Sequence, residues 1–246
     1  MFTIVLLMAT PACAIEPGDV VVNTIGMKLA YVPPGKYTMG SPAAERDRVA
    51  NETQSTVTFK SGFRIGVTEV TQKQWREVMG TDPSFFQGDE LPVEQITWQE
   101  ANKFCKRLSE KEHKRYRLPT MKEWEYACRA GTTTVYSSGN DAAALAKAGW
   151  YLGNSDNQSH AVGQKQPNAW GLYDMHGNVS EWCALAAKER SDSNSAQLDD
   201  EEKALRDLRG GSWGLNAPDC RSASIHANAG TFRYFDLGMR VVCELD

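Results

Sequence analysis

The sequence predicts an α+β fold that is rich in loops, with short helices and small antiparallel sheets. Seven tryptophans and eight tyrosines accompany 20 glycines and 10 prolines, a composition that favours long connections between short elements. Short runs in which apolar and polar residues alternate predict strands. Three Thr-x-x-Glu/Gln sequences predict helix starts. Hydrophobic residues make up 41% of the 246 residues, which is enough for a substantial core.

The expected strands lie near the two ends of the chain. Residues 23–41, NTIGMKLAYVPPGKYTMGS, contain two apolar runs around a Pro-Pro-Gly sequence, which predicts two strands and a turn. In residues 55–70 apolar and polar residues alternate, which predicts a half-buried pair of strands. The polar segment between these stretches, residues 43–54, predicts an exposed loop. The stretches LRGGSW (208–213) and FDLGMRVVCEL (235–245) predict closing strands.

Three helices are expected in the first half of the chain, at residues 72–79, 98–113 and 121–129. Each follows a threonine that precedes a Glu or Gln by three residues. In such a capping box the hydroxyl accepts a hydrogen bond from one unpaired backbone N–H, while the longer side chain accepts from another. In the second helix the following apolar residues share one face at helical spacing, which predicts that this face is buried: Trp98, Ala101, Phe104, Cys105 and Leu108.

The middle of the chain has little periodicity. Residues 130–183 are rich in Gly, Asn, Ser, Asp and Trp. Since buried backbone groups need hydrogen-bond partners, an ordered segment of this kind must be held by side-chain hydrogen bonds or by an ion. Residues 186–207 are polar and rich in charge, and they predict a solvated insertion.

The first 14 residues predict a signal peptide, and hence an exported protein, periplasmic or secreted. Ile4 to Ala9 form a short apolar core, and Ala12-Cys13-Ala14 fits a cleavage site of the small-x-small type. Cys13 as a lipoprotein cysteine is the alternative. The segment is too short to span a bilayer, and no transmembrane helix is apparent. The net charge of −4 and the lack of a basic tract argue against nucleic acid as a partner.

Seven stretches together resemble the formylglycine-generating enzyme, or sulfatase-modifying factor, family. The resemblance runs over residues 23–246, as a single domain, and implies a loop-rich variant of the C-type lectin fold. The stretches occur in this order: MKLAYVPPGKYTMGS, TEVTQKQW, LPVEQITWQEANKFCKRLS, RYRLPTMKEWEYACRAG, PNAWGLYDMHGNVSEW, RGGSW and GMRVV.

The family contains copper-dependent oxidases and also binding proteins, so the site must decide the function. The resemblance places the two copper-binding cysteines of the oxidases after the RGGSW stretch, where this chain has only Cys220. Counting forward from Gly210-Gly211-Ser212 places Leu215 at the first cysteine position and Cys220 at the second, whereas counting back from Gly238 places the second position near Ala217. Under either count the pair is incomplete, and Ile225 stands where the oxidases have an arginine. The sequence therefore predicts a non-catalytic member that binds a protein or a small-molecule ligand. The alternative is a copper- and O2-dependent oxidase, or a related redox enzyme, that uses Cys220 and Cys183.

The resemblance also implies two disulfides, Cys105 with Cys243 and Cys128 with Cys220. Each would close a long loop and thereby restrict the unfolded chain. The alternative interpretation is that the cysteines are small buried side chains. Under the disulfide interpretation Cys220 is structural and is not available to copper.

The stretch GLYDMHGNVSEW predicts a calcium loop. The resemblance implies that Ca²⁺ is bound through Asp174 and Glu181 and through the main-chain oxygens of Gly177 and Val179, and hard cations prefer such oxygen ligands. The alternative is that the acidic side chains cap turns without an ion. His176 lies in the same stretch without a nucleophile or a second histidine nearby in the sequence, which predicts a structural role.

The candidate ligand-binding residues lie in the C-terminal segment, in the stretch TFRYFDLG. Phe232, Tyr234 and Phe235 surround Arg233, and aromatic residues beside an arginine are the usual anchors of a binding surface. The alternative is that about half of these side chains belong to the core.

Overall fold

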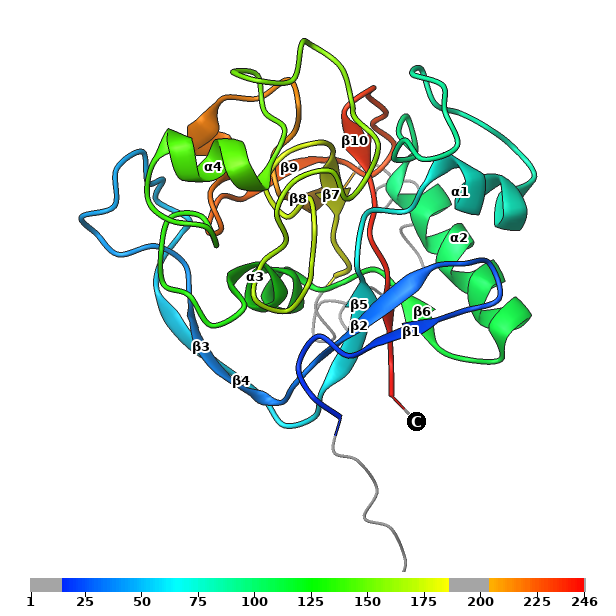
Figure 1. Ribbon diagram of the computed structural model, residues 1–246, viewed down its shortest axis with the longest axis horizontal. Helices are drawn as coiled ribbons and strands as arrows, with labels where there is room; N and C mark the ends of the chain where they lie inside the picture. Colours follow the sequence, from blue (N-terminus) through cyan, green and yellow to red (C-terminus); the bar gives the residue numbers. More distant parts are fainter. Residues whose placement is uncertain (1–14, 186–203, 246) are drawn as a thin grey trace, which may run out of the picture.

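The computed structural model describes residues 15–185 and 204–245. The predicted signal peptide, with Cys13, and most of the expected insertion at 186–207 lie outside these residues. The last part of that insertion is described, and it belongs to a strand, β8 (Leu205–Arg209). The chain forms an α+β fold with four short α-helices and small sheets in the described ranges (Figure 1).

Three sheets organise the strands. The five-stranded sheet has the order β1-β2-β5-β11-β6, and all its pairs are antiparallel. A four-stranded sheet has the order β10-β7-β8-β9, and β3 pairs with β4. The pair β10–β7 is parallel, an exception to the expected antiparallel arrangement. The bounds not yet given are β1 (Val20–Val22), β2 (Lys28–Val32), β3 (Gly35–Met39), β4 (Ser55–Phe59), β5 (Phe63–Gly66), β6 (Tyr116–Arg117), β7 (Ser180–Trp182), β9 (His226–Ala229), β10 (Leu237–Gly238) and β11 (Val242–Cys243).

The predicted helices are confirmed. They are α1 (Gln72–Met79), α2 (Trp98–Glu112) and α3 (Met121–Arg129), and each of the three capping boxes has both of its hydrogen bonds. A fourth helix, α4 (Ala142–Ala148), was not expected, and Asp141 caps its start. None of the described helices is long and apolar enough to cross a membrane.

The C-terminal residues connect the four-stranded sheet with the five-stranded sheet. The chain runs from β10 through the middle of the molecule and inserts β11 between β5 and β6 (Figure 1). The largest apolar cluster lies around this strand and α2. The predicted buried face of α2 is confirmed for Ala101, Phe104, Cys105 and Leu108, which are at most 2% exposed.

The two implied disulfides are not formed in the structure. The five described cysteines are buried thiols: Cys105, Cys128, Cys183, Cys220 and Cys243. Cys128 and Cys220 belong to different apolar clusters. The ring of His176 contacts both, with Nε2 lying 3.7 Å from the Cys128 thiol and Nδ1 lying 2.8 Å from the Cys220 carbonyl oxygen. The alternative interpretation, in which the cysteines pack as small buried side chains, describes the structure.

Candidate functional site

The predicted calcium loop is built around a buried ion pair. Glu181 on β7 and Arg240, which follows β10, are both 0% exposed. Arg240 donates three hydrogen bonds of 2.9–3.1 Å to the two oxygens of Glu181. The indole N–H of Trp124 donates a fourth, 2.7 Å long. Both carboxylate oxygens of Glu181 are therefore engaged by donors.

Two further carboxylates lie beside this pair. Glu69 accepts from the Val179 backbone N–H at 3.1 Å and from the Asn178 side chain at 3.0 Å. Asp174 accepts from the Gly163 backbone N–H at 2.7 Å, and its other oxygen, Oδ1, is buried without a hydrogen-bond partner. Burial, reinforced by Asp174 and Glu181, raises the pKa of Glu69 well above its usual range. Burial likewise raises the pKa of Asp174 to about 6.

These contacts fit a cation at Asp174 better than at Glu181. Three neighbouring carboxylates face one arginine, so an excess of buried negative charge needs compensation. Asp174 Oδ1 is an oxygen with its coordination still open, as a ligand of a hard cation would be. Both oxygens of Glu181 are instead engaged by Arg240 and Trp124. Of the two carboxylates in the implied ligand set, Asp174 therefore has the oxygen that is open to an ion.

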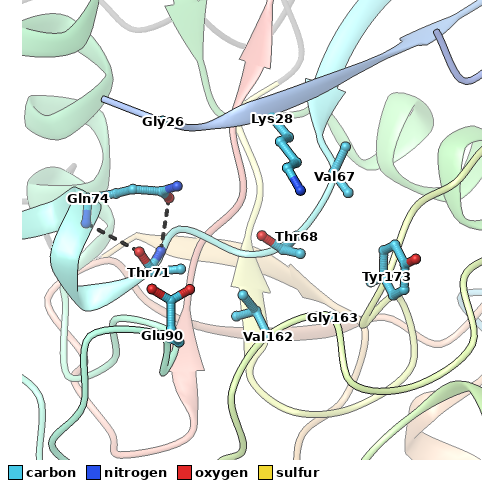
Figure 2. Close-up of a pocket in the computed structure, with 10 residues that line it drawn as sticks. All are labelled: Gly26, Lys28, Val67, Thr68, Thr71, Gln74, Glu90, Val162, Gly163 and Tyr173. Atoms are coloured by element: carbon cyan, nitrogen blue, oxygen red, sulfur yellow. Dashed lines mark hydrogen bonds between the residues drawn. The ribbon is translucent and has the colours of Figure 1, made fainter. Parts of the chain in front are cut away.

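A pocket of about 290 Å³ lies against the outside of this loop. Figure 2 shows the side chain of Lys28 reaching toward Thr68, with Glu90 below and Tyr173 at the opposite side. The wall residue Gly163 is the one that donates its N–H to Asp174. The pocket is therefore lined by an amine and a carboxylate, from Lys28 and Glu90, and by the side chain of Tyr173.

His176 is a structural residue, as the sequence predicts. Its Nε2 accepts from the Ser137 backbone N–H at 2.9 Å, so Nδ1 carries the proton and donates to the Cys220 carbonyl oxygen at 2.8 Å. Burial lowers the pKa of His176 to about 4. The imidazole is therefore neutral at pH 7, and both nitrogens are occupied in holding the fold.

This lowered pKa predicts a loss of stability in acid. Between pH 6.5 and 4 the unfolded histidine binds a proton that the folded one does not, so the free energy of unfolding should fall by up to about 3 kcal/mol as the pH drops. His176→Gln lacks this titration. The stability difference between the natural protein and the variant should therefore shrink from pH 6.5 to pH 4 in urea unfolding. A difference that does not change with pH would contradict the assignment.

The cysteines of the oxidase alternative lie in the interior of the protein. Cys220, the candidate catalytic residue, is 0% exposed, and burial raises the pKa of its thiol. Burial also raises the pKa of Cys183 well above its usual range, and that of Cys128 to about 12. Buried, protonated thiols are poor nucleophiles and poor metal ligands.

The predicted ligand-binding segment belongs to a larger aromatic surface. Successive ring centroids lie 4.0–6.0 Å apart and connect six side chains from three segments. We call the following residues the aromatic surface: Phe85, Phe86, Trp213, Phe232, Tyr234 and Phe235. Phe85 is 64% exposed, Tyr234 45% and Phe232 39%. Exposed apolar side chains that adjoin one another in this way mark interaction sites more often than scattered ones do.

The individual predicted residues differ in their roles. Phe232 and Tyr234 face solvent, whereas Phe235 is half-buried and stacks on Trp213. Arg233 turns away from the rings and binds Glu100 at 2.8 Å and the Gln95 carbonyl oxygen at 3.2 Å. The sequence analysis missed Phe85 and Phe86. The sequence did offer a signal for them, because two adjacent aromatic residues in a loop of Asp, Pro, Ser and Gln are unusual in a segment without other apolar residues.

Comparison with known proteins agrees with the resemblance seen in the sequence. Residues 26–245 match the family model described as "Sulfatase-modifying factor enzyme 1-like domain". The "Chaperone protein LppX" of Paenibacillus barcinonensis is 36% identical over 176 residues, which are 50% of this chain and 62% of that protein. The "Inactive C-alpha-formylglycine-generating enzyme 2" of Bos taurus is 28% identical over 177 residues, which are 68% of this chain and 53% of that protein. The chain thus spans less than two thirds of either relative.

Two solved structures match almost the whole chain. PvdO from Pseudomonas aeruginosa superposes with a TM-score of 0.82 at 29% identity, covering 94% of this chain and 100% of that one. Treponema denticola variable protein 1 superposes with a TM-score of 0.80 at 28% identity, covering 92% and 99%.

Proposed function

Since the chain belongs to the sulfatase-modifying factor family, whose members include oxidases and binding proteins, we propose that it is a non-catalytic member that binds a protein partner through its aromatic surface. The exposure of three connected rings, Phe85, Phe232 and Tyr234, carries the proposal. Aromatic anchors of this kind contribute most of the affinity at protein interfaces.

The names of two relatives support this choice. One is an inactive form of the formylglycine-generating enzyme, and another is called a chaperone. The first indicates that the fold persists in this family without the oxidase activity, and the second indicates a function exerted on other proteins. Burial of Cys220 and the replacement of the first copper-binding cysteine by Leu215 point in the same direction.

Site-specific photo-crosslinking tests the proposal. Benzoyl-phenylalanine at position 85 or 232 should crosslink the protein to a partner in the cells that produce it. The same group at position 110, on the exposed side of α2, serves as the control. Crosslinking at 85 and 232 should disappear when Tyr234→Ala is added. Yields at 85 and 232 no higher than at 110 would refute the proposal.

A copper titration tests the rival oxidase. We expect no tight Cu(I) binding in competition with a chelator, and no oxygen consumption with a peptide that carries a sulfatase-type cysteine. If one equivalent of Cu(I) binds tightly and Cys220→Ser abolishes it, the chain is a redox protein and the binding proposal fails.

We propose further that the loop at Asp174 holds Ca²⁺ as a structural ion, with main-chain oxygens of Gly177 and Val179. The ion would balance the carboxylates of Glu69 and Asp174, and it would stabilise the folded state by binding to it alone. Relative to a chelator, Ca²⁺ at about 100 times its dissociation constant should raise the melting temperature by about 5 °C or more. Asp174→Asn should remove this response, and Mg²⁺ serves as the control ion.

The alternative is that protons balance the charge. An acid with a raised pKa in the folded state contributes stability at low pH and loses it as the pH rises through the folded value, here about 6 for Asp174. Two results together would refute the calcium proposal. The melting temperature would be the same in Ca²⁺ and in chelator, and the natural protein would become more stable relative to Asp174→Asn as the pH falls from 7 to 5.

Export by the N-terminal segment is also proposed. We expect the mature protein to begin after Ala14, and Cys13→Ser to leave its amount and location unchanged. Mass spectrometry of the protein recovered from the producing cells and their medium measures both. A lipid-modified Cys13, or retention of residues 1–14, would contradict this expectation.

A further inference from the structure

Two carboxylates lie against the aromatic surface without a cation to balance them. Glu94 is 0% exposed. Its Oε1 accepts from the backbone N–H groups of Phe85 and Phe86 at 2.5 and 2.9 Å, and its Oε2 is buried without a hydrogen-bond partner. Asp236 directly follows Phe235 and accepts from the Ser212 hydroxyl at 2.5 Å. Neither acid forms an ion pair within the described ranges.

The arginines near this surface are already paired. Arg233 binds Glu100 at 2.8 Å, and Arg76 binds Asp82 at 2.6 Å and also Asp89. Burial raises the pKa of Glu94 to about 7, so this acid is partly neutralised by a proton at neutral pH. The charge that acts on a group placed against the rings is therefore mainly that of Asp236.

Aromatic faces and unbalanced carboxylates both attract a cation. The negative face of a ring binds an ammonium or guanidinium group that lies within about 6 Å, and the attraction grows when water is excluded. A guanidinium is planar, stacks on rings and donates to carboxylates through a fixed fork, which a lysine ammonium cannot do. The rings are open to solvent, with Phe85 64% and Tyr234 45% exposed, so they suit a side chain displayed on a large partner better than a small enclosed molecule.

We propose that the aromatic surface recognises an arginine side chain of a protein partner, held between the rings and the carboxylate of Asp236. This inference rests on the proposed function, since it names the chemistry that the same surface would bind. Glu94 is fully buried, so its part is to hold the backbone of Phe85 and Phe86 in place.

A pair of peptides that differ in one charge tests the inference. Acetyl-Gly-Arg-Gly-amide is titrated against the same peptide with citrulline, a neutral side chain of nearly the same shape, at constant ionic strength. Binding is followed by the NMR signal of the Trp213 indole N–H. We expect the arginine peptide to bind about tenfold more tightly. Asp236→Asn should reduce this ratio to about twofold, whereas Glu110→Gln, which changes the net charge equally at an exposed site on α2, should leave it unchanged.

The outcomes separate the two proposals. Equal binding of the arginine and citrulline peptides, or an unchanged ratio in Asp236→Asn, overturns the arginine inference, and the crosslinking experiment still decides the proposed function. Tighter binding of tetramethylammonium than of the arginine peptide also overturns it, in favour of a small quaternary ammonium ligand. If neither peptide binds and crosslinking at 85 and 232 also fails, both proposals are wrong. Tyr234→Ala should weaken both peptides without changing the circular dichroism spectrum.

Discussion

Replacing Arg240 by methionine should lower the free energy of unfolding by about 3–5 kcal/mol, the usual cost of removing one partner from a buried ion pair. Arg240 is 0% exposed, holds both oxygens of Glu181, and also donates to the carbonyl oxygens of Gly66 and Tyr173 at 2.8 Å. Methionine fills much of the same volume but leaves Glu181 buried with only Trp124 as a donor. Urea unfolding at pH 7 measures the loss.

Two companion variants keep this prediction testable. Arg240→Lys retains the charge without the forked geometry, and it should cost less than Arg240→Met while still folding. Arg46→Met removes an arginine whose side chain is 94% exposed and which pairs with Asp47 at the surface; it should change stability by about 0.5 kcal/mol or less. A cost for Arg240→Met as small as that of Arg46→Met would contradict the role of the buried pair.

The second large effect is expected at Glu125 on α3. This carboxylate is 0% exposed and accepts from Arg129 at 2.9 Å, from Arg209 at 2.6 Å and from the Gly40 backbone N–H at 2.8 Å. In Glu125→Gln the amide nitrogen would face an arginine donor, and two buried guanidinium groups would lose their counter-charge. We expect a loss of about 3–5 kcal/mol.

Hydrogen exchange locates the second effect. Arg209 ends β8 and also donates to the carbonyl oxygens of Ser222 and Ser224, so Glu125→Gln should accelerate amide exchange in residues 205–224 more than in α2. Glu110→Gln changes the same chemical group on an exposed face. It should neither lower the free energy of unfolding nor accelerate exchange in residues 205–224. Uniform acceleration over the whole chain would show that the ion pair does not specifically anchor this segment.

Local features of the fold could be predicted from the sequence. The starts of α1, α2 and α3 were correct because a capping box is satisfied within four consecutive residues and needs no distant partner. The end of α2 was one residue off. His113 adopts a left-handed conformation with φ 54°, a position where glycine is the usual signal and histidine is not.

The composition of the buried sites could not be predicted. Asp174 and Glu181 were recognised from one motif, but Glu69 and Arg240 come from other parts of the chain. The hydrogen bond between Glu69 and Asn178 spans 109 residues. For the same reason the sequence did not predict Phe85 as part of the aromatic surface, because its contact with Phe235 depends on how distant segments pack.

The sequence by itself determined the family, the helix starts and the structural character of His176, since each depends on which residues are present and on their local spacing. Only the tertiary structure decided that Glu181 is neutralised by Arg240, that Cys128 and Cys220 lie in different apolar clusters, and that six aromatic rings meet beside Glu94 and Asp236. The reason is physical. Burial and charge balance are properties of the surroundings of a side chain, and in this loop-rich fold those surroundings are supplied by segments tens to more than a hundred residues away.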